Sequence, residues 1–195
     1  YYAKYPRMPE LEILAVNIYR LAGLKVPNIE LFSSPDGKIG VLSEYIPNLE
    51  GIKAPNKSLY EGFAVDALLA NHDVIGADHK NSMTDGTNVY RIDMVCSFDR
   101  RGKGLKKEYS AIVKEIVSLM HPDINIDGAD IFTEMTREDL IKSLEKVCNI
   151  DEKALEKLFD TETKKQFLSI VKKRIVYLKE FLNQLKTTPQ GNMTT

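Results

Sequence analysis

Apolar residues recur at helical spacing near the start of the chain, and short β-like runs follow. Between residues 9 and 23 apolar positions lie three and four apart, and Gly23 supplies a stop, which predicts a helix. Residues 29–32 and 39–45 are rich in β-formers and flank Ser-Ser-Pro-Asp-Gly, so they predict a β-hairpin. A cluster of Pro, Asn and Gly over residues 47–57 predicts a connection between subdomains.

The rest of the chain is helical in pattern, apart from one loop and one short strand. Ser58 stands where it would cap a helix that carries apolar residues as far as Ala70. Residues 71–81 are polar and irregular, residues 85–88 have turn composition, and residues 89–92 predict a strand leading into Asp93. Three further helices are predicted around 112–117, from Thr136 to 147, and over 161–186 with Val176 facing inward. Residues 187–195 are polar and predict a flexible tail.

These elements together predict one α+β domain with two lobes. Residues 1–46 would form a partial sheet-and-helix lobe, residues 47–57 the connection, and residues 58–186 a mainly helical lobe. A length of 195 residues suits a single domain with a substantial core. The opening Tyr-Tyr-Ala-Lys-Tyr lacks an initiator Met and has the pattern of the middle of a strand, so we expect the chain to be a fragment.

Composition removes several classes of function. A formal net charge of -1 argues against a nucleic-acid binder, which normally has a strongly basic domain. The two cysteines have no CxxC spacing and histidines number only three, so neither a disulfide framework nor a zinc site is indicated and a reducing, cytoplasmic setting is expected. No apolar run approaches the roughly 20 residues that span a bilayer, so no membrane span is expected.

The residue types needed for metal-assisted phosphoryl transfer occur in one stretch. Asp73 follows a predicted helix, Asn81 lies further along the same loop, and Asp93 ends a short strand. Phosphoryl transfer needs metal ions that neutralise the phosphates and a carboxylate that orients the attacking hydroxyl. Oxygen ligands suit Mg²⁺ or Mn²⁺. Each of these residues alone is common in turns, so their order between helix and strand carries the interpretation.

One part of the chain resembles the catalytic segment of atypical bacterial kinases. It comprises the stretch from Gly62 to Gly76, then Asn81, then Val-Tyr-Arg-Ile-Asp at 89–93. These have a protein-kinase-like fold and form the HipA-like and phosphatidylinositol-kinase-like group, with kinase-like phage proteins and secreted effector kinases. The resemblance covers roughly the first half of the chain. It implies ATP-dependent transfer of the γ-phosphate to a protein hydroxyl, with a phosphoinositide or another small alcohol as alternatives, in the cytoplasm or in a host cytosol after secretion.

By this resemblance Asp73 is the catalytic carboxylate, and Asn81 and Asp93 are ligands of Mg²⁺ or Mn²⁺. Asp73 and Asn81 are eight residues apart, whereas typical protein kinases place the two about five apart, so Asp78 stays open as a substitute for Asp73. Asp93 is followed by Met-Val rather than Phe-Gly, and the chain contains no G-x-G-x-x-G. These departures keep a second interpretation open, a catalytically inactive kinase-like binding module, either a pseudokinase or a structural phage-type protein.

The resemblance also places ATP contacts in the first lobe. Lys4, in a strand-like run, would contact the phosphates, and Glu12 on the first predicted helix would hold Lys4 in place. Glu10 is a rival for this ion pair. Glu44 to Ile46 ends the second strand of the predicted hairpin and takes the position where backbone groups would meet adenine.

A basic run follows Asp93 closely. It contains five cations in eight residues with two glycines among them, namely Arg100, Arg101, Lys103, Lys106 and Lys107. Five like charges repel one another, so we predict that a multivalent anion such as an inositol polyphosphate binds this run and promotes activity. Cations at 172–174 would extend the surface if the fold brings them near. An acidic protein surface as the ligand, or simple solvation of the run, are the alternatives.

Overall fold

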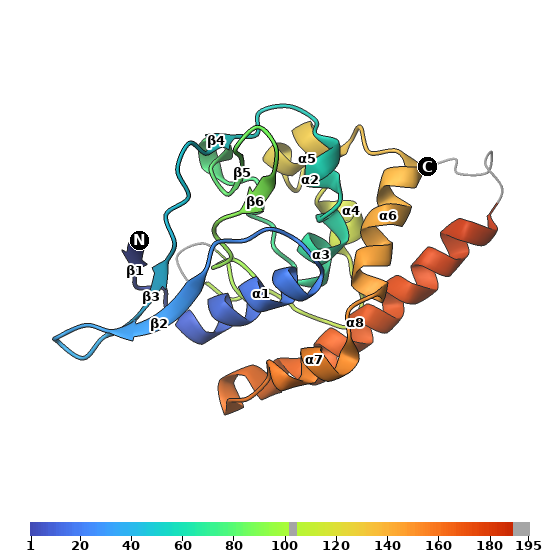
Figure 1. Ribbon diagram of the computed structural model, residues 1–195. Coiled ribbons are helices and arrows are strands. Elements are labelled where there is room, and N and C mark those ends of the chain that lie inside the picture. The colour runs from blue at the N-terminus through green and yellow to red at the C-terminus, as the bar shows by residue number, and fades with distance from the viewer. Residues whose placement is uncertain (102–104, 189–195) are drawn as a thin grey trace.

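The structure is a computed structural model and describes residues 1–101 and 105–188. Figure 1 shows a small antiparallel sheet at one end of the molecule, joined through helix α1 to a body made mainly of helices. Several helices and two small antiparallel sheets make up the fold, so the predicted α+β class is confirmed. No helix within the described ranges is long and apolar enough to cross a membrane.

The first sheet contains β1 (Tyr2–Lys4), β2 (Ile29–Ser33) and β3 (Ile39–Ser43) in the order β1-β3-β2. All neighbours are antiparallel, and Lys4 stands opposite Val41. The predicted hairpin is therefore confirmed, although β3 ends at Ser43, two residues earlier than expected. Helix α1 (Pro9–Leu21) contacts β2 and β3 and buries one apolar face, as its periodicity predicts.

A second sheet, which the sequence predicts only in part, joins the connection to the predicted loop. It contains β4 (Glu50–Gly51), β5 (Ser82–Thr84) and β6 (Val89–Arg91) in that order. Only β6 was expected, and it ends one residue before the predicted end. Along the chain, the 3-10 helix η1 (Ala77–His79) comes shortly before β5. The backbone N–H of Ile52 donates to the carbonyl of Ser82 at 3.2 Å, so this sheet fixes the loop against the connection.

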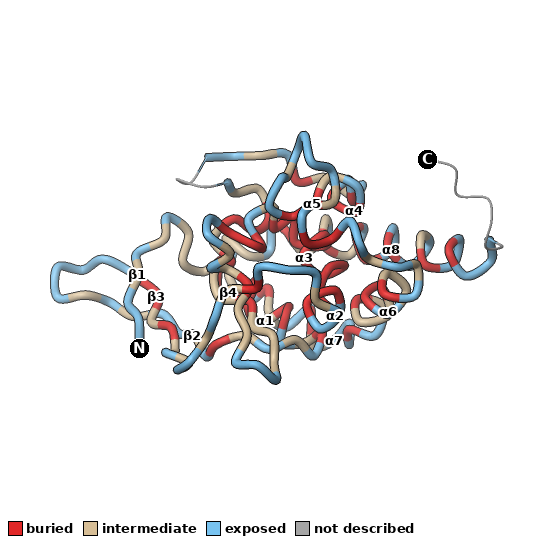
Figure 2. The backbone as a smooth tube through the Cα atoms, turned by 90° about the horizontal axis from the view of Figure 1, so that it is seen from above, coloured by how far each residue is buried: buried red, intermediate tan, exposed pale blue. Residues whose placement is uncertain are grey.

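The helical body surrounds α3 (Phe63–Leu68), all of whose residues are buried and appear red in Figure 2. Helix α3 contacts α4 (Glu115–Ser118), α6 (Arg137–Cys148) and α8 (Glu162–Thr187), and the body also contains α2 (Lys57–Tyr60), α5 (Ile126–Phe132) and α7 (Glu152–Lys157). The predicted helix after residue 57 is two helices, and the side chain of Asn56, not Ser58, caps the first. The prediction that Val176 faces inward is wrong, because 53% of it is exposed.

Arg174 of α8 joins the long helix to the end of α3. Its guanidinium donates to the carbonyls of Ala67 and Leu68 at 2.7 and 2.8 Å and pairs with Glu115 at 2.5 Å, and 1% of the side chain is exposed. The carbonyl of Ala67 also accepts from the backbone N–H of Ala70 at 2.9 Å, and that of Leu68 accepts from the hydroxyl of Tyr109 at 2.9 Å, so Arg174 is a second donor to each and joins α8 to the end of α3. Arg174 therefore does not extend the basic run, because its side chain lies inside the protein.

Candidate functional site

Three charged side chains from separate parts of the sequence meet beside α1. Nζ of Lys4, at the end of β1, contacts a carboxylate oxygen of Glu12 and lies 3.3 Å from Oδ1 of Asp93. Only 1% of the Glu12 side chain is exposed, and burial raises the pKa of its carboxyl while Lys4 opposes that shift. The rival Glu10 instead accepts a hydrogen bond from the hydroxyl of Thr161 at 3.0 Å. The predicted contact between Lys4 and Glu12 is therefore present.

Asp93 is held at the end of β6 with part of its carboxylate open to solvent. Its Oδ1 accepts a hydrogen bond from the backbone N–H of Val95 at 3.1 Å, in addition to the contact with Lys4. Of its side chain, 37% is exposed. One carboxylate oxygen is thus oriented by the protein, and the side chain still reaches solvent, which suits a ligand that arrives from outside.

A cleft of about 590 Å³ lies next to Lys4 and Asp93. Its walls include the segment after β3, with Glu44 and Ile46, Met83 of β5, and the two residues that follow β6. Pockets that hold small ligands measure roughly 300–1,000 Å³, so the cleft has room for a nucleotide-sized molecule. The carboxylate of Glu44 accepts a hydrogen bond from the backbone N–H of Asn28 at 3.0 Å, which fixes this wall to the first sheet.

Asp73 and Asn81 also lie together, on the loop after α3. The side-chain amide of Asn81 donates to the backbone carbonyl of Asp73 at 2.7 Å. Gly76 has φ +74°, and a Cβ there would lie 2.5 Å from Cγ of Asn81, so this turn requires a residue without a side chain. From the segment after Asp93, the thiol of Cys96 lies 3.6 Å from Oδ2 of Asp73. The loop and that segment therefore meet at Asp73.

The electrostatics of Asp73 follow from these neighbours. The residue as a whole is exposed, but the adjoining loops remove water from its carboxylate, and this raises its pKa, with the negative charge of Asp93 acting in the same direction. Desolvation and Asp73 also raise the pKa of Cys96 to about 12. A cation between Asp73 and Asp93 would relieve the repulsion. The alternative carboxylate, Asp78, is 79% exposed and pairs with Lys80 at 3.2 Å.

Asn81 and Asp93 carry an amide oxygen and a carboxylate, which are ligand types that suit magnesium or manganese. Among residues 1–101 and 105–188, no three or more His, Cys, Asp or Glu side chains gather where they could hold a metal by themselves. Mg²⁺ is usually held by one or two carboxylates, with phosphate oxygens and water completing its shell. One carboxylate and one amide oxygen are therefore a sufficient protein contribution for a metal bound to nucleotide, and an insufficient one for a resident metal.

The basic run divides into residues with different surroundings. The ammonium of Lys107 donates to the backbone carbonyls of Ala70 and Cys96, and burial lowers its pKa to about 8. Arg100 is 14% exposed and pairs with Asp99 at 3.0 Å, whereas Arg101 and Lys106 are exposed. The predicted polyanion ligand Lys103 lies outside the described residues. Lys107 thus already has partners, and the exposed cations of the described part of this run are Arg101 and Lys106.

Lys107 also lines a pocket of about 580 Å³ that opens at Asp73. Its other walls come from His72, Cys96, Arg100, Arg101, Asp123 and Ile124. Because Lys107 bonds one carbonyl on each side, it ties the loop that begins at Ala70 to the segment that follows Asp93. A charge count of the sequence offers no signal that would separate this lysine from its exposed neighbours.

A buried polar network, which sequence reasoning missed, connects the elements that hold the site. Arg91 of β6 donates to both carboxylate oxygens of Asp66 in α3, at 2.6 and 3.2 Å, and the two side chains are 2% and 0% exposed. The hydroxyl of Tyr19 in α1 donates to Asp66 at 2.8 Å and accepts from the amide of Asn71 at 3.2 Å. The available signal is an Asp inside the apolar run Ala-Val-Asp-Ala-Leu-Leu-Ala.

Comparisons with protein-family models, with curated proteins and with solved structures find no match to this chain. The geometry of the site therefore has to carry the functional argument. Its central feature is the convergence of Lys4, Glu12 and Asp93 at one end of a cleft, with Asp73 and Asn81 on the adjoining loop.

Proposed function

We propose that the chain has a protein-kinase-like fold and transfers the γ-phosphate of ATP to a hydroxyl group, that of a protein being the leading candidate. The observation that carries the proposal is the contact of Lys4 with both Glu12 and Asp93. A kinase site requires a lysine on the phosphates, a glutamate that holds this lysine and an aspartate that holds the metal. Exposed ion pairs contribute little, but Glu12 is buried and Asp93 is 89 residues away from Lys4.

The cleft supports a definite placement of the nucleotide. Adenine would lie against the backbone of residues 44–46, and the phosphates would extend toward Lys4 and Asp93, which line the same cleft. Lys4 is 29% exposed, so its ammonium can reach a phosphate while it stays in contact with Glu12. Glu12 acts on the nucleotide only through Lys4 and is therefore a positioning residue.

The loop after α3 supplies the remaining parts. Asn81 and Asp93 would hold Mg²⁺ or Mn²⁺, and the metal supplies positive charge against the phosphates when bound. Asp73 would orient the acceptor hydroxyl and accept its proton as the oxygen attacks the γ-phosphorus, while the bond from that phosphorus to the bridging oxygen breaks and ADP leaves. The exposed position of Asp73 next to a pocket of about 580 Å³ suits an acceptor as large as a protein loop.

A catalytically inactive binding module is the second candidate. The sequence favours it in two places, because no G-x-G-x-x-G is present and Met-Val follows Asp93. Such a module would bind nucleotide or a partner without phosphoryl transfer.

The kinase proposal includes activation by a phosphate-rich ligand such as an inositol polyphosphate. The exposed cations Arg101 and Lys106 support this part of the proposal.

Calorimetry with ATP and Mg²⁺, together with transfer of radiolabelled phosphate, tests the proposal. Lys4→Met should weaken nucleotide affinity with or without metal, and Asp93→Asn should weaken it only while metal is present. Lys38 is exposed, so Lys38→Met is the matched control. Asp73→Asn should lower the transfer rate about 10²–10⁴-fold at unchanged nucleotide affinity. Asp78→Asn should change neither. Nucleotide binding without transfer in the wild type would favour the inactive module. Absence of nucleotide binding would refute the kinase and would leave only a module that binds a partner.

A further inference from the structure

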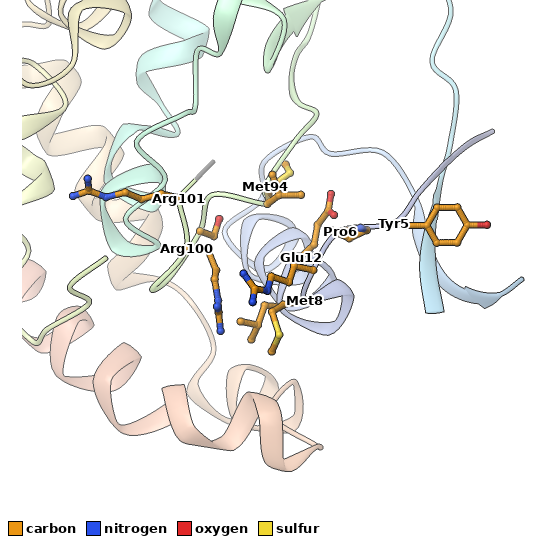
Figure 3. Close-up of a pocket in the computed structure, with 11 residues that line it drawn as sticks. Tyr5, Pro6, Met8, Glu12, Met94, Arg100 and Arg101 are labelled. Atoms are coloured by element: carbon orange, nitrogen blue, oxygen red, sulfur yellow. The ribbon is translucent and has the colours of Figure 1, made fainter. Parts of the chain in front are cut away.

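A second cavity borders Glu12 away from the nucleotide cleft. It measures about 310 Å³ and lies between the chain that enters α1, the first turns of α1 and the segment after Asp93 (Figure 3). The described residues that line it are all different from those that line the cleft. A single water takes up about 30 Å³, so the cavity is much larger than a hydration site.

The walls of the cavity are mainly apolar and include a polar group without a partner. Met8, Leu11 and Met94 supply apolar surface, and the two methionines are flexible enough to adapt to a guest. Ser97 is 2% exposed, and its hydroxyl has no hydrogen-bond partner in the part of the chain that the structure describes. Buried hydroxyls are nearly always hydrogen-bonded, so this one indicates a missing partner.

The charges around the cavity indicate whether that partner is an anion or a cation. Arg100 lines it with a largely buried guanidinium whose Nε pairs with Asp99 at 3.0 Å, and the carboxylate of Glu12 contacts Lys4. Figure 3 shows Arg101 extending away from Glu12 and Met8, which leaves Arg7 and Arg100 as the other cations that line the cavity. A hydroxyl and a guanidinium are both donors, and together they suit an anionic acceptor.

We propose that this cavity binds a compact apolar carboxylate, whose head group accepts hydrogen bonds from Ser97 and Arg100 and whose body lies between α1 and Met94. The cavity is at the lower end of the roughly 300–1,000 Å³ typical of small-molecule sites, so the ligand is small. An aromatic ring on a short carboxylate chain matches this size and the apolar walls.

The ligand would also stabilise the charged cluster in the cleft. It would pack against Glu12, which holds Lys4, and against Met94, which directly follows Asp93. A ligand that fits only while these segments are in place raises the affinity for ATP and Mg²⁺, and the nucleotide raises the affinity for the ligand by the same factor. This regulatory half rests on the proposed function, whereas the binding half does not.

The first experiment measures binding to the full chain by calorimetry with 3-phenylpropionate, its amide and the corresponding amine. We expect the carboxylate to bind and the two analogues to bind far more weakly. Ser97→Ala and Arg100→Gln should each weaken the carboxylate roughly tenfold or more, and Met8→Trp should abolish binding by filling the space. Arg101→Gln and the exposed Ser58→Ala are the matched controls and should leave binding unchanged.

Equal binding of amide and carboxylate, or equal losses in Arg100→Gln and Arg101→Gln, would overturn the proposed head-group site. No heat signal at millimolar concentration would mean that the cavity holds water only. The second experiment measures ATP affinity with Mg²⁺ at saturating 3-phenylpropionate. A severalfold tighter nucleotide supports the coupling, and an unchanged affinity overturns it while the binding half stands. A chain that binds 3-phenylpropionate and never binds ATP refutes the proposed function and with it the coupling.

Discussion

Gly62→Ala reverses an ordinary expectation about glycine and tests the buried network directly. Gly62 precedes α3 with φ −94°, a conformation that any residue adopts, so replacement by Ala would normally add about 0.5–1 kcal/mol of stability. Here a Cβ would lie 2.4 Å from Nη2 of Arg91 and 2.5 Å from its Cζ, against an ordinary contact distance of 3.4 Å or more. The guanidinium therefore has to withdraw by about 1 Å from a fully packed site.

That displacement acts on the strongest bonds of the network. Nη2 of Arg91 donates to Asp66 at 2.6 Å and to the carbonyl of Leu59 at 2.8 Å, and an added 1 Å takes both beyond the usual limit of about 3.2 Å. Hydrogen bonds to charged groups contribute about 1.5–3 kcal/mol each, and overpacking adds to the loss. We expect a net destabilisation of about 2–4 kcal/mol, or a fall in Tm of roughly 5–15 °C for a domain of this length.

Urea and thermal unfolding of the wild type and Gly62→Ala measure the effect. The control background is Asp66→Leu with Arg91→Met, where apolar side chains replace the pair and no guanidinium opposes the methyl group. In that background Gly62→Ala should be neutral or slightly stabilising. A Gly62→Ala protein at least as stable as the wild type, or one equally destabilised in both backgrounds, would refute the reasoning.

Three further outcomes follow from the site. Gly76→Ala should push the side chain of Asn81 aside, weakening ATP binding with Mg²⁺ but not in EDTA, and equal losses by calorimetry would contradict this. Arg174→Lys should cost about 3–5 kcal/mol in urea unfolding, since an ammonium cannot replace the guanidinium fork, while the exposed Lys173→Ala should cost almost nothing. Lys107 releases its proton near pH 8 when folded and near its ordinary 10.5 when unfolded. The unfolded state therefore binds more protons between these values, and the stability of the wild type relative to Lys107→Gln should rise from pH 8 to 10.5; a flat or falling difference would contradict the assignment.

Long periodic elements were predictable from the sequence, and short paired ones were not. α1, α6 and α8 have apolar spacing that repeats over several turns, and the turn residues between β2 and β3 identify their hairpin. Strands β4 and β5 have two and three residues and exist because each has a partner elsewhere in the chain. Such pairing is a tertiary effect, so no local pattern indicates it.

The site shows the same division between local and distant causes. Asp73 and Asn81 share a loop, and Asn81 bonds the backbone of Asp73, a contact that the sequence separation permits. Charge is the one property of Lys107 that the sequence displays, and its cationic neighbours share it. Its partner Ala70 lies 37 residues earlier, and φ +53° at that residue turns the chain into the loop of Asp73. The burial that distinguishes Lys107 arises only when the two segments meet.

The buried pair of Asp66 and Arg91 explains how the two halves of the site stay in register. Asp66 lies on α3, five residues before Asn71 and the loop of Asp73, and Arg91 lies on β6, two residues before Asp93. A buried ion pair gives little net stability compared with well-packed apolar residues, so stability alone is a weak reason to keep one. It does impose one geometry, because a slip of β6 by one residue would leave both charges buried and unpaired. Tyr19 adds α1 to the same constraint. The network thereby fixes helix α1 with Glu12, the loop with Asp73, and strand β6, which leads to Asp93, against one another. A site assembled from three distant segments requires such a constraint.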